Sequence, residues 1–313
     1  MEIIYNNLKV SLPDAIIVGA AKAGTTSLFN YLSDHPQIFK PRIKEPWFFS
    51  YKDNIPNFII PTNGKPNTKE IITDEVDYFN LFKNENKYLI EGSTSYLYTA
   101  KDTIENIKEI YGDSYSDLKI VIVLRNPVQR AWSHYIMHVR DGKTNLSFFD
   151  SIKESIIKER LKRGCIIGYD YIGFGLYYSQ VKLFMKTFSN VKIIIYDEYK
   201  KNSRETLDDL TNFFDLDGFN YCTDKKYNVS GVPKNRIYKI ISNLLTRESF
   251  FKSYLGPIFL NKFLYNQILK LKSKMYKKKL LNESDKKVLI EIYREDVKLL
   301  ENLIKVDLCH WLK

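Results

Sequence analysis

The stretch Ala15–Ser27 reads AIIVGAAKAGTTS, and it carries the strongest structural signal in the chain. Its first four residues are an apolar run of the kind found in fully buried parallel strands. Residues 25–32 have the pattern of a helix that ends near His35 and Pro36. A helix that begins directly after a glycine-containing turn points several backbone N–H groups, with partial positive charge, at one place. The stretch therefore predicts a strand, a phosphate-binding loop and a helix.

The loop resembles the nucleotide P-loop pattern G-x-x-x-x-G-K-[ST], with one difference that matters. Thr25 stands where that pattern has its lysine, and the loop's own lysine is Lys22. A magnesium-dependent P-loop enzyme also needs an acidic residue after a later strand, but the strand 119–124 is followed by Arg125. We therefore expect phosphate binding without a metal, and a P-loop kinase is the weaker alternative. The dinucleotide pattern G-x-G-x-x-G is absent from this loop, which leaves hydride transfer without support.

A second signal lies at residues 124–135, which read LRNPVQRAWSHY. Arg125 ends a buried strand, at the edge where open α/β sheets bind ligands. Pro127 is favoured in the first turn of a helix, and Ser133 follows Arg125 by about two helical turns. An arginine fork and a hydroxyl at this edge predict a second anion site. An ion pair between Arg125 and a carboxylate is the structural alternative.

Alternating strands and helices predict an α/β fold with three α/β/α layers around a central, P-loop-like parallel sheet. We expect strands at 15–18, 88–90, 119–124 and 191–196, and helices at 25–32, 99–111, from Pro127 onward, at 175–188 and at 203–214. Ser203, with Thr206 three residues later, is expected to cap the last of these helices. Residues 50–70 are expected to form a surface loop, and the pattern from Ile237 onward is wholly helical. We expect one domain over 1–313, with a core at about 12–235 and a helical, basic region at about 236–313.

The composition gives broader limits. The chain has 313 residues, 44% of them hydrophobic, and a formal net charge of +11, which suits polyanionic partners unless it only reflects a bias toward lysine. The basic segment Lys262–Lys279 suits an acidic acceptor, a membrane surface, or simply a solvated helix face. No apolar run is long enough to span a membrane, and the first residues lack the pattern of a secretory signal. Three scattered cysteines indicate neither disulfides nor a metal site, so we expect a cytoplasmic protein.

Together the two anion-binding segments resemble the family of sulfotransferases that use PAPS (3′-phosphoadenosine 5′-phosphosulfate), and most closely its bacterial and heparan-sulfate-type branch. Further similar segments are KEPWFF at 44–49, EGSTSY at 91–96, GLYY at 175–178, NVSGVPK at 228–234 and YRED at 293–296. Gly92 and Trp47 depart from the residues common in the heparan-sulfate enzymes. Both lie near the expected acceptor side, so the resemblance leaves the acceptor open.

The resemblance implies a role for particular residues. Lys22 would stabilise the leaving phosphate, Glu45 would act as the general base, and Lys44 would position the sulfuryl group or the acceptor. The rival bases are the four histidines, His35, His134, His138 and His310, and His134 beside Ser133 is the first of them to consider. The expected PAPS-binding residues are those of the loop, of the strand end and of a third segment: Lys22, Ala23, Gly24, Thr25, Thr26, Ser27, Arg125, Ser133, Ser230, Gly231 and Lys234. The aromatic residues Trp47, Phe48, Phe49, Tyr96 and Tyr98 are expected either to wall the acceptor cleft or to belong to the core.

We therefore expect a sulfotransferase that moves a sulfuryl group from PAPS to a hydroxyl or an amine, with PAP as product and no metal. A glycan or glycolipid is the first acceptor to expect. Besides the P-loop kinase, a non-enzymatic polyanion-binding module is an alternative, although the sequence has no recognised nucleic-acid-binding motif. Peripheral membrane contact through the basic C-terminal region is compatible with this function.

Overall fold

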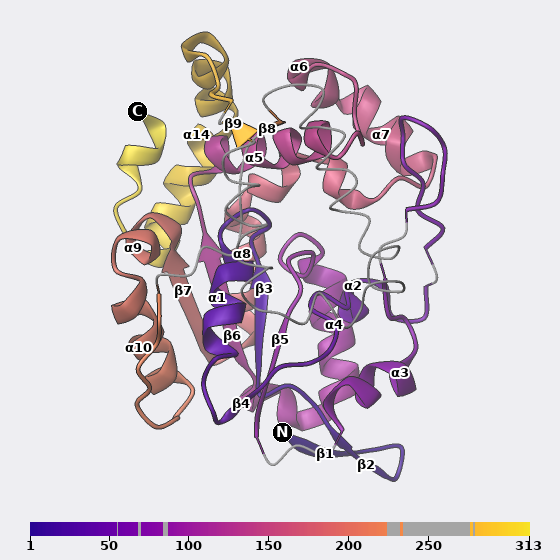
Figure 1. The fold of residues 1–313 in the computed structure, drawn as a ribbon, viewed down its shortest axis with the longest axis vertical. Helices are drawn as coiled ribbons and strands as arrows, with labels where there is room; N and C mark the ends of the chain where they lie inside the picture. The colour runs from indigo at the N-terminus through magenta and orange to yellow at the C-terminus, as the bar shows by residue number, and fades with distance from the viewer. Residues whose placement is uncertain (55, 68–69, 84–86, 224–231, 234–275, 278) are drawn as a thin grey trace, which may run out of the picture.

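A five-stranded parallel sheet lies at the centre of the fold, with the strand order β4-β5-β3-β6-β7 (Figure 1). The computed structural model describes residues 1–54, 56–67, 70–83, 87–223, 232–233, 276–277 and 279–313. The five strands are β3 (Ala15–Gly19), β4 (Ile38–Phe39), β5 (Tyr88–Gly92), β6 (Lys119–Leu124) and β7 (Asn190–Ile195). In the central strand β3 and its neighbour β6, every residue but Lys119 is buried. Their unbroken apolar runs are therefore explained by burial on both faces, as expected for a parallel sheet.

The helices form two groups, which confirms the predicted α/β arrangement around the sheet. α1 (Thr25–Leu32) packs on α10 (Ser203–Phe213), whereas α8 (Tyr177–Thr187) packs on α4 (Ala100–Tyr111) and on α14 (Glu283–Ile304). The other helices are α2 (Phe48–Tyr51), α3 (Glu75–Phe79), α5 (Pro127–Arg140), α6 (Phe148–Ser151), α7 (Glu154–Lys162) and α9 (Tyr196–Lys201). Short 3₁₀ turns are η1 (Asn80–Phe82), η2 (Gly112–Asp117), η3 (Ile167–Tyr169), η4 (Gly173–Gly175) and η5 (Cys309–Leu312).

The element boundaries differ from the predicted ones in a few places. β7 begins and ends one residue earlier than the predicted strand 191–196, because Tyr196 already begins α9. The predicted cap of α10 is wrong. Asn202 occupies the N-cap position without a side-chain bond, and the Ser203 hydroxyl donates to the carbonyl of Tyr199 instead. The hydroxyl bonds to α9 because α9 ends at Lys201, only one residue before α10 begins. The expected loop 50–70 also begins inside the short helix α2.

An N-terminal hairpin was missed, although its signal is present in the sequence. β1 (Glu2–Tyr5) and β2 (Leu8–Ser11) pair antiparallel, joined by Asn6 and Asn7 with φ of 50° and 64°. Two consecutive residues with positive φ are what a two-residue hairpin turn requires, and asparagine tolerates them better than most residues. The Asn-Asn pair thus marks the turn.

The C-terminal helix is anchored on the body of the protein through two of the segments that resemble the sulfotransferase family. The Asp296 carboxylate accepts hydrogen bonds from the amides of Tyr177 and Tyr178, at 2.7 Å and 3.2 Å, so it serves the first turn of α8. Tyr293 is buried against Gly175, where an added Cβ would lie 2.9 Å from the tyrosine hydroxyl. Residues 175–178 and 293–296, which are more than a hundred residues apart in the sequence, thus contact each other, and α14 becomes part of the core.

The region from Ile237 onward, expected to be wholly helical, contains the short strand β9 (Tyr276–Lys277). β9 pairs antiparallel with β8 (Val232–Pro233), which precedes that region, and β8 lies beside α5 (Figure 1). The basic segment Lys262–Lys279 otherwise lies almost entirely outside the described residues. Among the helices that the structure describes, none combines the length and the apolar character needed to cross a bilayer.

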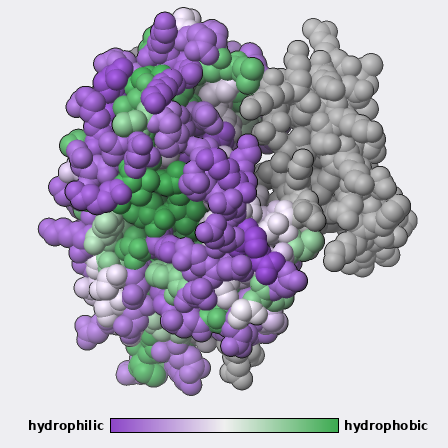
Figure 2. Space-filling view, turned by 90° about the vertical axis from the view of Figure 1, so that its left-hand side faces the viewer, coloured by the Kyte–Doolittle hydropathy of each residue, from purple (hydrophilic) through white to green (hydrophobic). Residues whose placement is uncertain are grey.

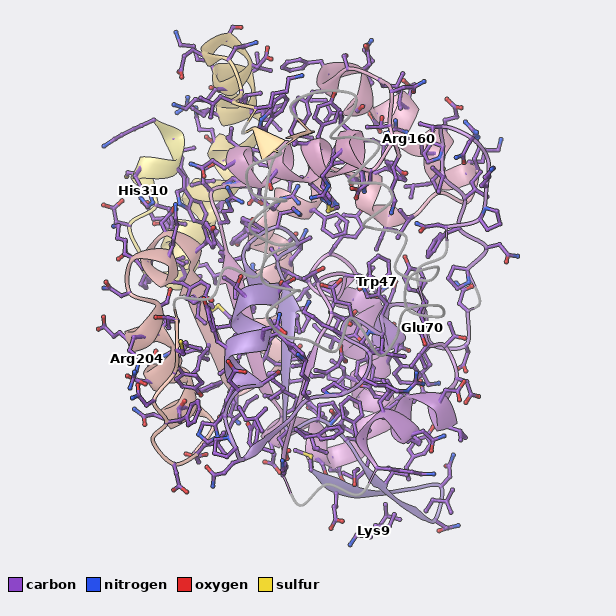
Figure 3. All side chains as sticks on the ribbon, in the orientation of Figure 1. Lys9, Trp47, Glu70, Arg160, Arg204 and His310 are labelled. Carbon is purple, nitrogen blue, oxygen red and sulfur yellow. The ribbon has the colours of Figure 1, made fainter. Side chains whose placement is uncertain are left out.

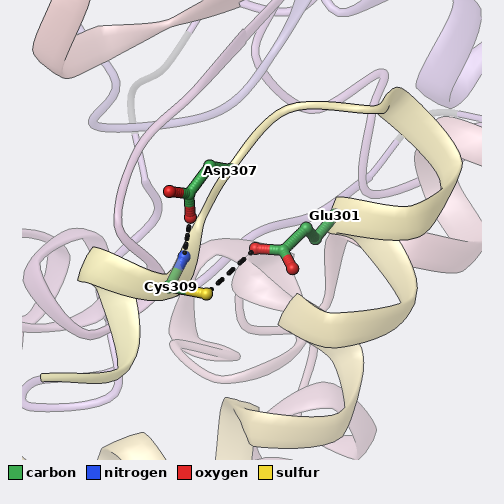
Figure 4. Close-up of side chains that lie close together, drawn as sticks. All are labelled: Glu301, Asp307 and Cys309. Atoms are coloured by element: carbon green, nitrogen blue, oxygen red, sulfur yellow. Dashed lines mark hydrogen bonds between the residues drawn. The ribbon is translucent and has the colours of Figure 1, made fainter.

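The last turn of the chain contains a small group of acidic and thiol side chains (Figure 4). The Cys309 amide donates to Asp307, and the Glu301 carboxylate accepts from the Leu308 amide at 2.7 Å. These carboxylates therefore hold the turn η5 in place against α14. Hydrogen bonding to Asp307 and the neighbouring negative charges raise the pKa of the Cys309 thiol.

The side of the molecule that carries α9 and α10 has a mostly hydrophilic surface, with a large hydrophobic patch near its centre and smaller hydrophobic areas toward the top and the bottom (Figure 2). β7 is the last strand of the sheet on this side, and Ile194 is its only fully buried residue. The edge strand is thus much less covered than β3 or β6.

Candidate active site

A cleft with a volume of about 1200 Å³ opens at the carboxyl ends of the parallel strands. Segments that follow four of the five strands line it: Lys22 after β3, Thr94 after β5, Arg125 after β6, and Tyr196 after β7. This is the edge at which open α/β sheets bind their ligands. Trp47 and His310 also line the cleft and lie well apart in Figure 3, which shows that the cleft is long.

The predicted phosphate loop has the expected place and shape. Gly24 has a φ of 87° and an added Cβ would lie 2.8 Å from the Tyr196 ring, so glycine is required there for conformation and for space. An added Cβ on Gly19 would lie 2.6 Å from Leu97. The amides of Ala23 and Ser27 donate to the carbonyls of Ala20 and Gly24. The amides of Gly24, Thr25 and Thr26 have no backbone acceptor within the described residues, and the last two begin α1.

Lys22 extends from this loop toward α5. Its ammonium donates to the thioether of Met137 at 3.3 Å. Burial, followed by the nearby charge of Arg140, lowers the pKa of Lys22 to about 8. The Lys22 ammonium is thus held in a partly dehydrated position, with no carboxylate bonded to it in the part of the chain that the structure describes.

Arg125 lies beside the same loop, and the two predicted anion sites are therefore adjacent. Its Nη1 donates to the Lys22 carbonyl at 2.9 Å, and its guanidinium stacks 4.9 Å from the centre of the Tyr196 ring. Its Nε is buried without a hydrogen-bond partner, and no ion pair to a described carboxylate is formed. The alternative in which Arg125 is locked against a carboxylate is thus not what the described residues show.

One face of α5 forms a wall of the cleft along the length of the helix. Asn126 caps this helix through bonds from the amides of Val128 and Gln129. Ser133 lines the cleft, as predicted, and so do Met137 and Arg140, which lie four and seven residues further on. These spacings place the three side chains on one side of the helix. Sequence reasoning singled out Ser133 alone, although the helical period starting from it points to the other two.

Glu45 and Lys44 form a close pair next to the cleft. The Lys44 ammonium donates to Glu45 Oε1 at 2.7 Å, and both side chains are about four-fifths buried, with 21% and 22% exposed. Thr94 and the Trp47 indole each donate to Glu45 Oε2 at 3.4 Å. Glu45 lines the cleft, whereas Lys44 lies behind it, near the Phe29 ring. The predicted pair is thus present, with the carboxylate in front.

A buried carboxyl group supports the segment that carries Glu45. Glu91 is completely buried, and its Oε2 accepts from the hydroxyls of Tyr78 and Tyr96, each at 3.0 Å. The Tyr96 hydroxyl in turn accepts from the Phe49 amide at 3.3 Å. Burial raises the pKa of Glu91 to about 7, against the opposite effect of its hydrogen bonds. Sequence reasoning had quoted Glu91 only as part of a similar segment, and did not recognise this network.

Two buried histidines lie under the other half of the cleft. His134, the rival base, contacts Arg130 through Nδ1 at 3.2 Å, and His138 contacts the Tyr171 hydroxyl at 2.8 Å. Burial and neighbouring positive charges lower the pKa of His134 well below its usual range and that of His138 to about 3. Both imidazoles are therefore neutral and weakly basic at physiological pH.

The remaining predicted residues fall into three groups. Ser230, Gly231 and Lys234 lie outside the described residues. Ala23 is fully buried under the loop, and Gly24, Thr25, Thr26 and Ser27 line the cleft. Of the aromatic candidates, Phe48, Phe49 and Tyr96 belong to the core, Trp47 is both buried and at the cleft wall, and Tyr98 stacks on Phe174.

Comparison with known proteins gives a consistent family. The family model described as "Sulfotransferase domain" matches residues 12–226, more than half of the chain. The chain is 26% identical over 235 residues to the bifunctional heparan sulfate N-deacetylase/N-sulfotransferase 1 of Caenorhabditis briggsae, covering 71% of this chain and 25% of that protein. It is 30% identical over 138 residues to the membrane-associated sulfotransferase kil1 of Dictyostelium discoideum, covering 44% of this chain and 25% of the relative. The chain thus spans about a quarter of the length of these relatives.

A solved structure extends the similarity to nearly the whole chain. The sulfotransferase from Alicyclobacillus acidocaldarius superposes with a TM-score of 0.70 at 28% identity, covering 97% of this chain and all of that one. Its match includes the helical C-terminal region as well as the sheet. On the family match, the fold and the solved relative, the chain belongs to the sulfotransferase family.

Proposed function

We propose that this protein transfers a sulfuryl group from PAPS to a hydroxyl or amine of an acceptor, and that a glycan is the acceptor class to test first. The observation that carries the proposal is the adjacency of two anion sites without an acidic residue between them. The Arg125 guanidinium is bonded to the backbone of the Lys22 loop at 2.9 Å. A nucleotide with phosphate groups on both the 3′ and the 5′ carbon of one ribose has two such anions close together.

The fit of the nucleotide rests on unfilled donors. The amides of Gly24, Thr25 and Thr26 would bind the 5′-phosphate at the start of α1, with help from the threonine hydroxyls. Arg125, whose buried Nε has no partner, and the Ser133 hydroxyl would bind the 3′-phosphate. Because the 5′-phosphosulfate is a single bridged group, no metal is needed to join neighbouring phosphates. Ser230, Gly231 and Lys234 are proposed to complete the nucleotide site.

The transfer step follows from the two charged groups beside this site. The acceptor oxygen or nitrogen attacks sulfur in line, and the bond from sulfur to the 5′-phosphate oxygen breaks, with its electron pair leaving on PAP. The Lys22 ammonium stabilises the charge that develops on that oxygen. Glu45 accepts the proton of the acceptor, and its ion pair with Lys44 fixes the carboxylate in place.

His134 and His138 are poorly suited to act as the base in place of Glu45. Efficient proton transfer needs a base whose proton affinity is matched to the working pH. The pKa values of His134 and His138 are strongly lowered by burial and by positive neighbours. His134 is also engaged with Arg130.

The choice of a glycan acceptor rests on the relatives. Two curated relatives are named as acting on heparan sulfate or carbohydrate, the latter being the human carbohydrate sulfotransferase 15 at 22% identity over 188 residues. The departures Trp47 and Gly92 lie next to Glu45 and at the end of β5, so the acceptor of this chain need not match theirs.

Nucleotide binding gives the first test. We expect PAP to raise the melting temperature and to bind equally well with and without EDTA, because the site uses amides and cations alone. Stabilisation by Mg·ATP but not by PAP would instead favour a phosphotransferase. A steep salt dependence of nucleic-acid binding with no nucleotide effect would favour the polyanion-binding module.

Turnover gives the second test. Incubation with ³⁵S-labelled PAPS and fractionated glycan, lipid and peptide pools should label one class of acceptor, identified by mass spectrometry. Lys22→Ala should abolish nearly all labelling, by about 10²–10³-fold as for loss of one transition-state donor. Lys40→Ala, on the exposed surface, is the matched control. Full turnover in Lys22→Ala would contradict the mechanism.

A further inference from the structure

The cleft contains many more positive than negative groups. Among the described residues that line it, the only carboxylates are Glu45 and Asp197, whereas the cationic side chains are Lys22, Arg125, Arg140, Lys143, Lys200, Lys279, Lys286 and Lys313. Glu45 is bonded to Lys44 and Asp197 lies 3.6 Å from His310. Nucleotide binding near Arg125 accounts for part of this excess, but not for the cations at the other end of α5.

α5 separates these two groups of cations along one axis. Arg125 precedes its first turn, Met137 lies beside the Lys22 ammonium, and Arg140 is its last residue. The rise from Met137 to Arg140 is about 4.5 Å along the helix axis. Since the reacting sulfur would lie near Lys22, Arg140 is on the side away from the nucleotide, within about one sugar unit of the reacting atom.

Several elements contribute positively charged side chains around the C-terminal end of α5. Asp141 orients the Arg140 guanidinium through Nε and Nη2, at 2.7 Å and 3.2 Å. Lys143 is half-buried, and no ion pair of its ammonium is formed with a described carboxylate. Beneath them, Arg130 and Arg160 are buried and likewise form no ion pair with a described carboxylate.

The pKa values of the two buried histidines are lowered in part by positive charges in this region. After burial, the charges of Lys22 and Lys143 are among the causes that lower the pKa of both His134 and His138. Such a concentration of positive charge in a partly buried wall favours the binding of a negatively charged group. The geometry and the charges thus suit an anionic ligand.

We propose that Arg140 and Lys143 form an acceptor subsite for an anionic group, a carboxylate or a sulfate, carried by the acceptor about one sugar unit from the atom that is sulfated. This inference rests on the proposed function, because it takes Lys22 as the point of transfer. It restricts the acceptor to a negatively charged glycan or conjugate, and excludes a neutral sugar as the preferred substrate.

The experiment uses the PAP complex, so that the nucleotide site is filled. PAP binding is first measured by calorimetry, and its absence would overturn the proposed function itself. The complex is then titrated with sodium sulfate, and in a second series with sodium glucuronate, while sodium chloride keeps the ionic strength constant. Histidine ring signals are followed by NMR. Comparison of the sulfate and glucuronate series identifies which anion the subsite prefers.

We expect the ring signals of His134 and His138 to move saturably as the anion binds beside Arg140 and Lys143. The signals of His35, which is bonded to the Asp217 carbonyl elsewhere, should stay fixed. Lys143→Gln and Arg140→Gln should each weaken the apparent affinity by about tenfold or more, in line with loss of a charged hydrogen bond. Lys158→Gln, which removes an exposed lysine paired with Glu154, is the matched control.

Two results would overturn the subsite while leaving the proposed function intact. One is PAP binding without any saturable histidine response to either anion. The other is a response of the same affinity in Lys143→Gln and Arg140→Gln as in the unmodified protein. As an activity readout, both variants should raise KM for an anionic acceptor and leave KM for PAPS unchanged.

Discussion

The two ends of α5 are built differently, although both line the same cleft. At the first end, Arg125 is held by a backbone carbonyl and a tyrosine ring, and Asn126 caps the helix. At the other end, Arg140 is held by its neighbour Asp141, and 27% of its side chain is exposed. The end proposed to bind the nucleotide (the nucleotide end) is thus fixed by the fold, whereas the end proposed to bind the acceptor (the acceptor end) is made of side chains that can change without disturbing it.

The sharpest way to separate the two ends is to remove the proposed base. Glu45→Gln should lower kcat by about 10²–10⁴-fold, because proton removal by a placed carboxylate contributes that much. The dissociation constant of PAP should not change, since Glu45 lies on the acceptor side of Lys22. Single-turnover kinetics and calorimetry measure the two quantities. An unchanged kcat would assign the base to another group.

The nucleotide end can be tested with paired ligands. Arg125→Gln should weaken PAP binding by about 10–100-fold, the value of a charged hydrogen bond to phosphate. Adenosine 5′-phosphosulfate lacks the 3′-phosphate, so its affinity should be nearly the same in both proteins. Equal losses for the two ligands would show that Arg125 supports the loop through the Lys22 carbonyl rather than binding the 3′-phosphate.

The pH dependence tests the group that lies between the two ends. Lys22 has a pKa of about 8, and its charged form is the active one, so kcat/KM for PAPS should fall above pH 8 and be about tenfold lower one unit above pH 8. Lys22→Arg keeps its charge at those pH values, and whatever activity it retains should lack this alkaline limb. An identical limb in Lys22→Arg would attribute the titration to another group.

The smallest expected effect is on stability rather than on catalysis. It concerns Glu91, which supports the segment carrying Glu45 through Tyr96. Its pKa is raised by burial from 4.5 to about 7, so the folded protein binds a proton that the unfolded chain releases. The free energy of unfolding should therefore decrease as pH rises from about 4.5 to 7. Glu91→Gln should flatten that decrease and add on the order of 1–3 kcal/mol at pH 8. Urea denaturation at several pH values measures it, and an unchanged slope would contradict the burial argument.

The parts of the site that could be predicted from sequence are those formed by a few consecutive residues. A buried strand, a left-handed glycine and a helix start fix the loop around Lys22 locally, and the same is true of Leu124 to Pro127. Ser133 could be predicted to lie near Arg125 because the two residues are about two helical turns apart. Continuing that spacing for two more turns would have given Met137 and Arg140.

Other parts depend on contacts between distant segments, and no local pattern encodes them. Glu91 owes its role to Tyr78 and to the Phe49 segment, which reach it through tertiary packing. The cap of α10 was assigned incorrectly because Ser203 bonds to the preceding α9. The position of Lys44 behind Glu45 follows from packing near Phe29, and adjacency in sequence cannot distinguish which of the two faces the cleft.

The turn η5 bears directly on how the protein can be handled. The Trp311 carbonyl accepts from the side-chain Nδ2 of Asn126 at 3.2 Å, and His310 and Lys313 belong to the cleft wall. A purification tag or fluorescent fusion attached after Lys313 would therefore sit at the mouth of the site, beside the residue that caps α5. Tags at the hairpin end of the chain avoid this interference.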